Sequence, residues 1–333
     1  MGRYEKMLLL SKIIGKRNLC RLQSALKYAL SFRGSYNNQK NTTKRNWGGK
    51  TYVFIVDGKT PHGGLSDRLR GLFSVYDYCK ERGYIFKILW IYPENIQNYF
   101  VPASVDWRIE PEEMVYDRKI VDFRFFNSYS FMNNDEKSYA KLLDSKKPII
   151  HVYSNVTIHE EKFDMYFREL FVLSAELDTA VRKQLSAIGS EYISISFRLA
   201  DLLGDFVDCP DIFPELENEK VKEEYIGACI NAIKTLKEKN PEISKILVTA
   251  DSAKFLQEAE KLSYVYIVSG TIVHMDQANK NDEMSQIKNY LDFLLIAKAI
   301  KCYYFVHGRM YASTRFASTA ALIGGKKIEQ LKI

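Results

Sequence analysis

The sequence predicts an α/β protein with parallel sheets, arranged as two doubly wound domains that face a cleft. Short apolar runs alternate with longer segments of helical periodicity along most of the chain. The chain has 333 residues, more than one typical core accommodates, and 46% of them are hydrophobic. Glycines and polar side chains follow several predicted strands, which is where open parallel sheets bind ligands.

The first 50 residues form a basic, partly helical arm outside these domains. They contain twelve Lys or Arg residues and the single acid Glu5, a local net charge of +11. Apolar residues at positions 19, 22, 26, 29 and 30 lie near one helical face, a pattern that suits the surface of an anionic membrane. A helix packed on the protein body, or a disordered tail after Arg33, explains the same pattern. Peripheral membrane contact through residues 1–46 is therefore one of three interpretations.

The rest of the chain argues against several classes of protein. Residues 51–333 hold 36 basic and 40 acidic residues, so a nucleic-acid-binding surface over the whole protein is not expected. The five cysteines are far apart and form no CxxC pair, which predicts a cytoplasmic protein with neither a disulfide framework nor a zinc site. No stretch of ~20 uncharged apolar residues is present, so no membrane-spanning helix is predicted.

The predicted N-terminal domain, residues 51–172, begins as a β-loop-α-β unit. Residues 51–57 read as a buried strand, a glycine-rich loop follows, and Ser66 is expected to cap a helix that ends at Gly83. Residues 84–91 form the next strand, which should lie parallel to the first. A short helix is expected near residues 93–100 and a further strand at residues 148–153.

The predicted C-terminal domain, residues 173–333, alternates more clearly between strands and helices. Strands are expected at residues 192–197, 245–249, 264–268 and 302–306. Helices are expected at residues 174–188, 219–239, 252–262 and 283–300, with a final helix from residue 316. This alternation predicts a parallel sheet with ligands at the carboxyl ends of its strands.

The segment HGRMYASTRFASTAALIGG, residues 307–325, carries the clearest functional signal. It places Ser313, Thr314 and Arg315 where a buried strand gives way to a helix. The free N–H groups of a helix N-terminus, together with the helix dipole, bind phosphate well. An ordinary Ser/Thr helix cap is the alternative interpretation.

Three other strand ends carry side chains suited to ligand binding. HGGLSDRLRG, residues 62–71, lets the backbone approach a ligand just before a helix. ISISFRLADLLGDF, residues 193–206, delivers Arg198 to a sheet edge, where a structural carboxylate or a ligand phosphate would pair with it. ILVTADS, residues 246–252, places Thr249 and Asp251 at a third strand end, where capping of the next helix is the alternative.

Taken in order, these motifs resemble the GDP-fucose-dependent fucosyltransferase superfamily. The matching segments are GG-x-x-[DN]-R, strand-F-R-x-x-D, T-x-D, LDFLLIAK and YASTRFASTAALIGG, which span roughly residues 51–325. The superfamily includes protein O-fucosyltransferases, core α1,6-fucosyltransferases and bacterial nodulation fucosyltransferases. The resemblance implies a GT-B fold of two Rossmann-like domains, with the acceptor on the N-terminal side and the nucleotide sugar on the C-terminal side.

The resemblance also implies roles for individual residues. Arg198 matches the arginine that grips the β-phosphate of GDP-fucose, although Ser196 and Leu199 replace a histidine and a second arginine of the family pattern. Asp251 and Asp292 match acidic positions of the nucleotide site. The other expected donor-binding residues are Gly63, Gly64, Asp67, Asp201, Thr249, Ser313, Thr314 and Arg315.

The function implied is that of an inverting glycosyltransferase that transfers fucose from GDP-fucose to a glycan hydroxyl. No D-x-D sequence, the metal–diphosphate bridge of many other glycosyltransferases, is present, so neither a metal nor a cofactor is expected. Asp205, one residue short of the glutamate position of the core enzymes, is preferred as the base that deprotonates the acceptor, and His62 beside the glycine loop is the second candidate.

Other functions explain the same motifs. A GT-B transferase with a different nucleotide sugar would need a similar diphosphate site. A non-catalytic protein that binds nucleotide sugars or polyanions would keep that site and lack the base. In the catalytic interpretation, the basic arm would hold the enzyme near a membrane where lipid-linked glycans are assembled.

Overall fold

The computed structural model describes residue 36 and residues 47–126, 135–207, 214–272, 275 and 283–332, with only the backbone at residues 283–285. Most of the basic arm lies outside the described residues, and so does the predicted membrane contact of residues 1–46. Tyr36 is the exception within the arm's first 46 residues. Its ring is buried beside Tyr116 and Phe123, and its hydroxyl lies 2.5 Å from Nδ1 of His151 on the first sheet.

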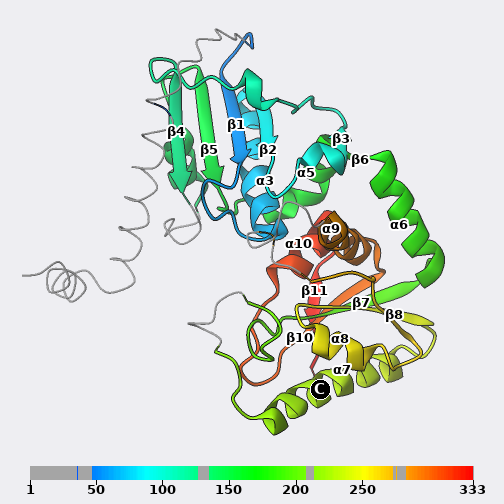
Figure 1. The fold of residues 1–333 in the computed structure, drawn as a ribbon. Helices are drawn as coiled ribbons and strands as arrows, with labels where there is room; N and C mark the ends of the chain where they lie inside the picture. Colours follow the sequence, from blue (N-terminus) through cyan, green and yellow to red (C-terminus); the bar gives the residue numbers. More distant parts are fainter. Residues whose placement is uncertain are drawn as a thin grey trace, which may run out of the picture.

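Four parallel strands form the sheet of the N-terminal domain (Figure 1). Their order across the sheet is β2 (Ile85–Trp90), β1 (Thr51–Val56), β5 (Ile149–Ser154) and β4 (Val121–Phe126). The helices of this domain are α3 (Leu65–Arg82), α4 (Glu136–Leu143) and α5 (Phe163–Leu170). Strands β2 and β5 lie on opposite sides of β1, so a topological switch point lies between the carboxyl ends of β1 and β5.

Helix α3 begins two residues earlier than the sequence predicts. Its N-cap is Gly64 and not Ser66, because Gly64 has extended backbone angles and its carbonyl accepts the N–H of Arg68 at 3.2 Å. The helix ends as predicted at Gly83, whose φ of 65° allows its N–H to close the last turn on the carbonyls of Cys79 and Lys80. The start of α3 therefore lies directly beside the glycine loop.

The C-terminal domain contains a parallel sheet of five strands. Their order is β11 (Ile328–Gln330), β10 (Lys301–Phe305), β7 (Tyr192–Phe197), β8 (Lys245–Ala250) and β9 (Val265–Tyr266). The helices are α6 (Ala175–Ile188), α7 (Glu219–Lys239), α8 (Ala253–Ala259), α9 (Glu283–Lys298) and α10 (Arg315–Ile323). The two parallel sheets confirm the predicted α/β class, and the switch point of this second sheet lies between β7 and β10.

The region between residues 93 and 147 differs most from the prediction. The expected short helix is one 3-10 turn, Ile96–Asn98, followed by β3 (Phe100–Pro102). Strand β3 pairs antiparallel with β6 (Phe171–Leu173), far away in the sequence. The strand β4, the helix α4 and the strand β11 are additional elements, and two further 3-10 turns span Pro111–Glu113 and Glu160–Lys162.

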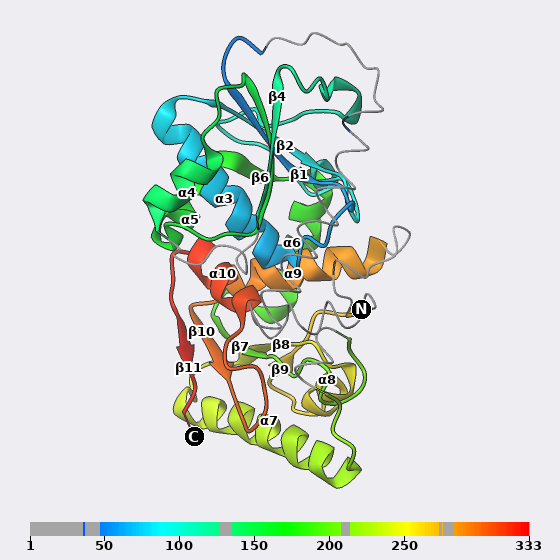
Figure 2. The same cartoon turned by 90° about the vertical axis from the view of Figure 1, so that its left-hand side faces the viewer.

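Helices α9 and α10 lie between the two sheets (Figures 1 and 2). Helix α10 packs on α3 and α5 of the N-terminal domain as well as on α9. Phe73 and Phe163 of the first domain belong to the same buried apolar cluster as Phe293 and Ala317 of the second. Because apolar burial stabilises this interface, the two domains are joined by a shared core as well as by the chain.

Three of the five cysteines lie among the described residues. Cys79, Cys229 and Cys302 are buried and unpaired, and burial raises the pKa of each thiol. Within the described ranges, no helix is both long enough and apolar enough to cross a membrane.

Candidate functional site

A cleft of about 340 Å³ lies between the two domains, a volume typical of small-molecule sites. Nine of the site residues expected from the sequence line it. Those from the N-terminal domain are Gly64 and Asp67, and those from the C-terminal domain are Arg198, Thr249, Asp251, Asp292, Ser313, Thr314 and Arg315. Segments that are far apart in the sequence thus meet at one cleft.

The C-terminal wall of the cleft is the switch point of the second sheet. Arg198 directly follows β7, and the loop at residues 306–314 follows β10. The N–H of Tyr311 donates to the carbonyl of Arg198 at 3.2 Å, so these two loops are joined. Thr249, at the end of β8, contributes a hydroxyl 2.7 Å from that of Ser196. The carboxyl ends of three neighbouring strands therefore form one surface.

Arg198 and Asp251 form an ion pair in this surface. The Nη1 atom of Arg198 lies 2.8 Å from Oδ2 of Asp251, whose carboxylate also accepts the backbone N–H groups of Leu199 and Ala200. The Asp251 side chain is 7% exposed, and burial raises its pKa while the charge of Arg198 lowers it. Asp251 is thus a structural partner of Arg198 and holds the guanidinium at the cleft wall.

Asp292 and Lys288 form a buried pair one turn apart on α9. The Nζ atom of Lys288 lies 2.9 Å from Oδ2 of Asp292 and donates to the carbonyl of Val268 at 2.7 Å. The Oδ1 atom of Asp292 is buried without a hydrogen-bond partner among the described residues. Burial raises the pKa of Asp292, and Lys288 opposes that rise. An unsatisfied buried acceptor costs about 1–3 kcal/mol, so this oxygen is suited to a hydrogen-bond donor of a ligand.

The first turn of α10 is consistent with both interpretations made from the sequence, a helix cap and an anion site. Thr314 is the N-cap, and its hydroxyl accepts the N–H of Ala317 at 3.4 Å. Ser313, Arg315 and Phe316 line the cleft together with Thr314. The cap satisfies one N–H of the first turn, and the N–H groups that precede it have no acceptor within the helix. Capping and anion binding are therefore compatible at this helix.

Helix α3 brings a second helix N-terminus to the cleft, from the opposite domain. Gly64, Asp67 and the two residues between them line the cavity. The Oδ1 atom of Asp67 lies 3.2 Å from Nη1 of Arg315, so the two walls meet at this ion pair. Gly63 has a φ of 79°, and a Cβ atom there would lie 2.8 Å from Oδ2 of Asp67. The glycine loop thus makes room for the Asp67 carboxylate.

Asp205 and Asp201 do not line the cleft. The Oδ2 atom of Asp205 accepts the hydroxyl of Ser252 at 2.9 Å and the backbone N–H of Lys254 at 2.8 Å, so its carboxylate caps α8. Phe206 lines the cavity in its place. The chain turns after β7 through Ala200, whose φ is 51°, and this path directs the following acids elsewhere. The position of Asp205 gives no support to the predicted role as a base.

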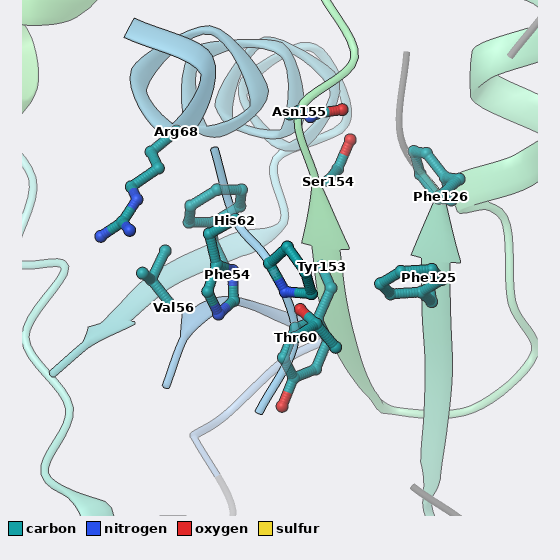
Figure 3. A pocket seen from close by; sticks show the side chains of 11 residues that line it. Phe54, Val56, Thr60, His62, Arg68, Phe125, Phe126, Tyr153, Ser154 and Asn155 are labelled. Carbon is teal, nitrogen blue, oxygen red and sulfur yellow. The ribbon is translucent and has the colours of Figure 1, made fainter. Parts of the chain in front are cut away.

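His62 lines a second cavity at the switch point of the first sheet (Figure 3). Its Nε2 atom accepts the backbone N–H groups of Asp57 and Gly58, both at 3.2 Å, and its ring stacks on Tyr153. The volume, about 20 Å³, is enough for roughly one water molecule. Because Nε2 already accepts these hydrogen bonds and does not border the main cleft, His62 shapes the loop after β1 and its predicted role as a base is unsupported.

Among the described residues, one group of side chains outside the cleft has the composition of a metal site. Ligand atoms of Asp77, Glu81 and His159 lie within 4.8 Å of one another. However, Asp77 already accepts hydrogen bonds from Tyr166 and Lys162, and it lies 2.6 Å from Nδ1 of His159. The Lys162 ammonium occupies the position of a cation, so this group is a hydrogen-bonded network between α3 and α5.

Sequence reasoning missed several residues of the cleft. Lys288 is the clearest case, since a lysine four residues before Asp292 on the same predicted helix is itself a signal of an ion pair. Tyr311, Phe206 and Met275 also line the cavity, and nothing in their sequence context distinguishes them from core residues.

The fold and the cleft define an α/β protein with two Rossmann-like domains around a ligand site, the GT-B architecture. The sequence matches no protein-family profile and no curated protein. Among solved structures, the chain is similar to the NodZ α1,6-fucosyltransferase soaked with GDP-fucose, with a TM-score of 0.53, 16% identity, and coverage of 83% of this chain and 92% of that one.

Two further structures share this fold. Fucosyltransferase NodZ from Bradyrhizobium has a TM-score of 0.52 and 17% identity, with coverage of 83% of this chain and 93% of that one. A mutant of Arabidopsis thaliana FUT1 in complex with GDP has a TM-score of 0.51 and 12% identity, with coverage of 98% and 78%. The predicted resemblance to GDP-fucose fucosyltransferases is therefore confirmed at the level of the fold.

Proposed function

We propose that this protein is a glycosyltransferase that transfers fucose from GDP-fucose to a hydroxyl group of a glycan. The observation that carries the proposal is the cleft, where Arg198 and the N-terminus of α10 meet at the switch point of a parallel sheet. Both are donors suited to anionic oxygen atoms. The fold is shared with fucosyltransferase structures obtained with GDP-fucose or GDP, which supports the same donor here.

The proposed chemistry explains why these donors lie together. Transfer breaks the bond between C1 of fucose and an oxygen of the β-phosphate, which leaves negative charge on the diphosphate. Arg198, oriented by Asp251, would bind that charge together with the first turn of α10 and its residues Ser313 and Arg315. Donors that are fixed in advance stabilise a transition state most, and each charge-assisted hydrogen bond contributes about 1.5–3 kcal/mol. In this proposal protein cations balance the diphosphate, so no metal ion is required.

Asp292 and Lys288 would select the base of the nucleotide. The unpaired Oδ1 of Asp292 can accept hydrogen bonds from N1–H and the 2-amino group of guanine, and Lys288 beside it can donate to the O6 atom. Uracil and adenine do not present this combination of donors and acceptor. The buried position of the pair, with side chains 4% and 11% exposed, makes a mismatch costly.

Nucleotide binding provides the direct test. Calorimetric titration with GDP, IDP, ADP and UDP, repeated in EDTA, should give the tightest binding for GDP in both conditions. IDP lacks the 2-amino group, and the loss of one hydrogen bond to a charged acceptor predicts binding weaker by about ten- to a hundredfold. Asp292→Asn should weaken GDP binding by a similar factor and reduce the difference between GDP and IDP. Asp77→Asn, which alters a buried carboxylate outside the cleft, is the matched control.

Donor turnover separates the alternatives. Release of GDP from GDP-fucose, faster than from GDP-mannose, would support the proposed donor. Tight binding of UDP or a UDP-sugar with no preference for guanine would refute it and favour a transferase with another donor. Binding of GDP-fucose without release of GDP, across a panel of glycan acceptors, would indicate a protein that only binds nucleotide sugars.

A further inference from the structure

We propose that Asp67 accepts the proton of the acceptor hydroxyl, an inference that rests on the function proposed above. Asp67 is expected from the sequence only as a donor-loop residue, while the two predicted bases, Asp205 and His62, do not line the cleft. Three carboxylates do so within the described chain: Asp67, Asp251 and Asp292. Their surroundings assign them different roles.

The carboxylates of the C-terminal domain are not available as bases. Asp251 is held by Arg198 and by two backbone N–H groups. Asp292 is paired with the buried Lys288 on the same helix. Both are almost fully buried on the wall that carries the proposed diphosphate site. In the proposed function both therefore serve the donor, because Asp251 orients Arg198 and the unpaired Oδ1 atom of Asp292 binds guanine.

Asp67 lies on the other wall. It is in the first turn of α3 in the N-terminal domain, and its side chain is 27% exposed. Its Oδ1 atom meets Arg315, and within the described part of the chain its Oδ2 atom has no hydrogen-bond partner. Its charged neighbours include Arg315 on α10, with which it forms an ion pair, and Arg70, one turn later on α3. A partly exposed carboxylate with one unused oxygen is the group expected of a base in an inverting transfer.

The proposed step moves one proton and exchanges one bond. The acceptor oxygen forms a bond to C1 of fucose while the bond from C1 to the β-phosphate oxygen breaks, and its electron pair remains on GDP. The proton of the acceptor hydroxyl passes to Oδ2 of Asp67, which becomes a neutral carboxyl group and later returns the proton to water. Arg315, between the two walls, would contact both the diphosphate and Asp67 and thereby set their separation.

Donor hydrolysis tests this role without a known acceptor, because water is then the hydroxyl that must lose a proton. The variant Asp67→Ala should bind GDP-fucose within about threefold of the wild-type affinity and hydrolyse it at least a hundredfold more slowly. Azide is a nucleophile that carries no proton, so millimolar azide should restore GDP release in Asp67→Ala and form fucosyl azide. Azide should have little effect on the wild-type protein.

A matched variant controls for loss of the domain interface. Glu160→Gln removes a carboxylate that pairs with Arg70 beside the same interface but does not line the cleft, and it should hydrolyse GDP-fucose at the wild-type rate. Hydrolysis by Asp67→Ala within tenfold of wild type would overturn the inference. Loss of both hydrolysis and the azide reaction, with binding retained, would also overturn it, because Asp67 would then position the donor.

The two proposals fail in distinguishable ways. Wild-type protein that does not bind GDP-fucose would overturn the proposed function and this inference with it. Wild-type protein that binds and hydrolyses GDP-fucose while Asp67→Ala behaves identically would leave the proposed function intact and overturn the role of Asp67 alone.

Discussion

The contact between α3 and the end of β5 leaves no room for a side chain at Gly71. A Cβ atom built on Gly71 would lie 2.0 Å from the carbonyl oxygen of Ser154, 2.6 Å from its carbonyl carbon and 2.9 Å from Cα of Asn155. All three are backbone atoms at the end of a paired strand, so they cannot rotate away. Since comfortable contacts require roughly 3.5 Å, Gly71→Ala must displace α3 or β5 by about 1.5 Å.

The expected cost follows from two opposing effects. Inserting one methyl group into a packed region costs about 1–3 kcal/mol, and the rigid neighbours favour the upper end of that range. Alanine offsets about 1 kcal/mol of this because it favours helix over glycine. We therefore expect Gly71→Ala to lower the free energy of unfolding by about 2 kcal/mol. A displaced α3 would also shift Asp67, which lies one turn earlier on the cleft.

Gly227 supplies the matched control. It lies within α7, and a Cβ atom there would meet nothing within 4 Å. Gly227→Ala should therefore stabilise the protein by about 0.5–1 kcal/mol through helix propensity alone. Urea unfolding followed by fluorescence and by circular dichroism would measure both variants. Equal stability of the two variants would refute the packing of α3 against β5.

Two further predictions concern charged and titratable groups. Burial lowers the pKa of His151 to about 3, so this residue stays neutral in the folded protein while the unfolded chain binds a proton near its ordinary pKa of 6.5. The stability that results is fully present above pH 6.5 and is lost as the pH falls toward 3, with a loss of about 2 kcal/mol at pH 5. Urea unfolding at pH 5 and pH 8 should show this loss in the wild-type protein and not in His151→Gln. An equal loss in the two proteins would contradict the prediction. Arg70→Met should lower the free energy of unfolding by about 2 kcal/mol, because it leaves the buried hydroxyl of Thr319 without its partner. The control Arg168→Met removes an arginine from an exposed ion pair and should change the free energy of unfolding by less than about 0.5 kcal/mol. Similar effects of the two substitutions would argue against the contact between α3 and α10.

The strands at the centre of each sheet were predictable because they are buried on both faces. Residues 192–197 form β7 as predicted, and all six are buried. The edge strand β4 carries a weaker signal, because its sequence VDFRFF has half-buried polar residues between its apolar ones. Strand β3 pairs with β6 about seventy residues away, a contact that local periodicity does not encode. Local pattern therefore predicts strands made of mostly apolar runs, the edge strand β2 included, and misses short strands and strands interrupted by polar residues.

The same contrast between local pattern and tertiary structure explains which site residues could be predicted. Residues directly at strand ends, such as Arg198 and Asp251, were predictable because parallel topology fixes where strand ends meet. Asp205 lies seven residues beyond Arg198, and its position depends on how the intervening loop folds. That loop turns toward α8, where Asp205 caps a helix. Tertiary structure thus decides which of several neighbouring carboxylates lies in the cleft.

The convergence of α3 and α10 gives the cleft its chemical asymmetry. Helix N-termini favour anions, and here two of them meet from opposite domains. At α10 the first turn carries hydroxyls and Arg315, which leaves its positive end open to an external anion. At α3 the first turn already carries the anionic Asp67, which offsets that helix end and faces Arg315. In the proposed function, an external diphosphate would therefore be favoured at the α10 wall and repelled by Asp67 at the α3 wall, which would leave a carboxylate on the acceptor side of the cleft.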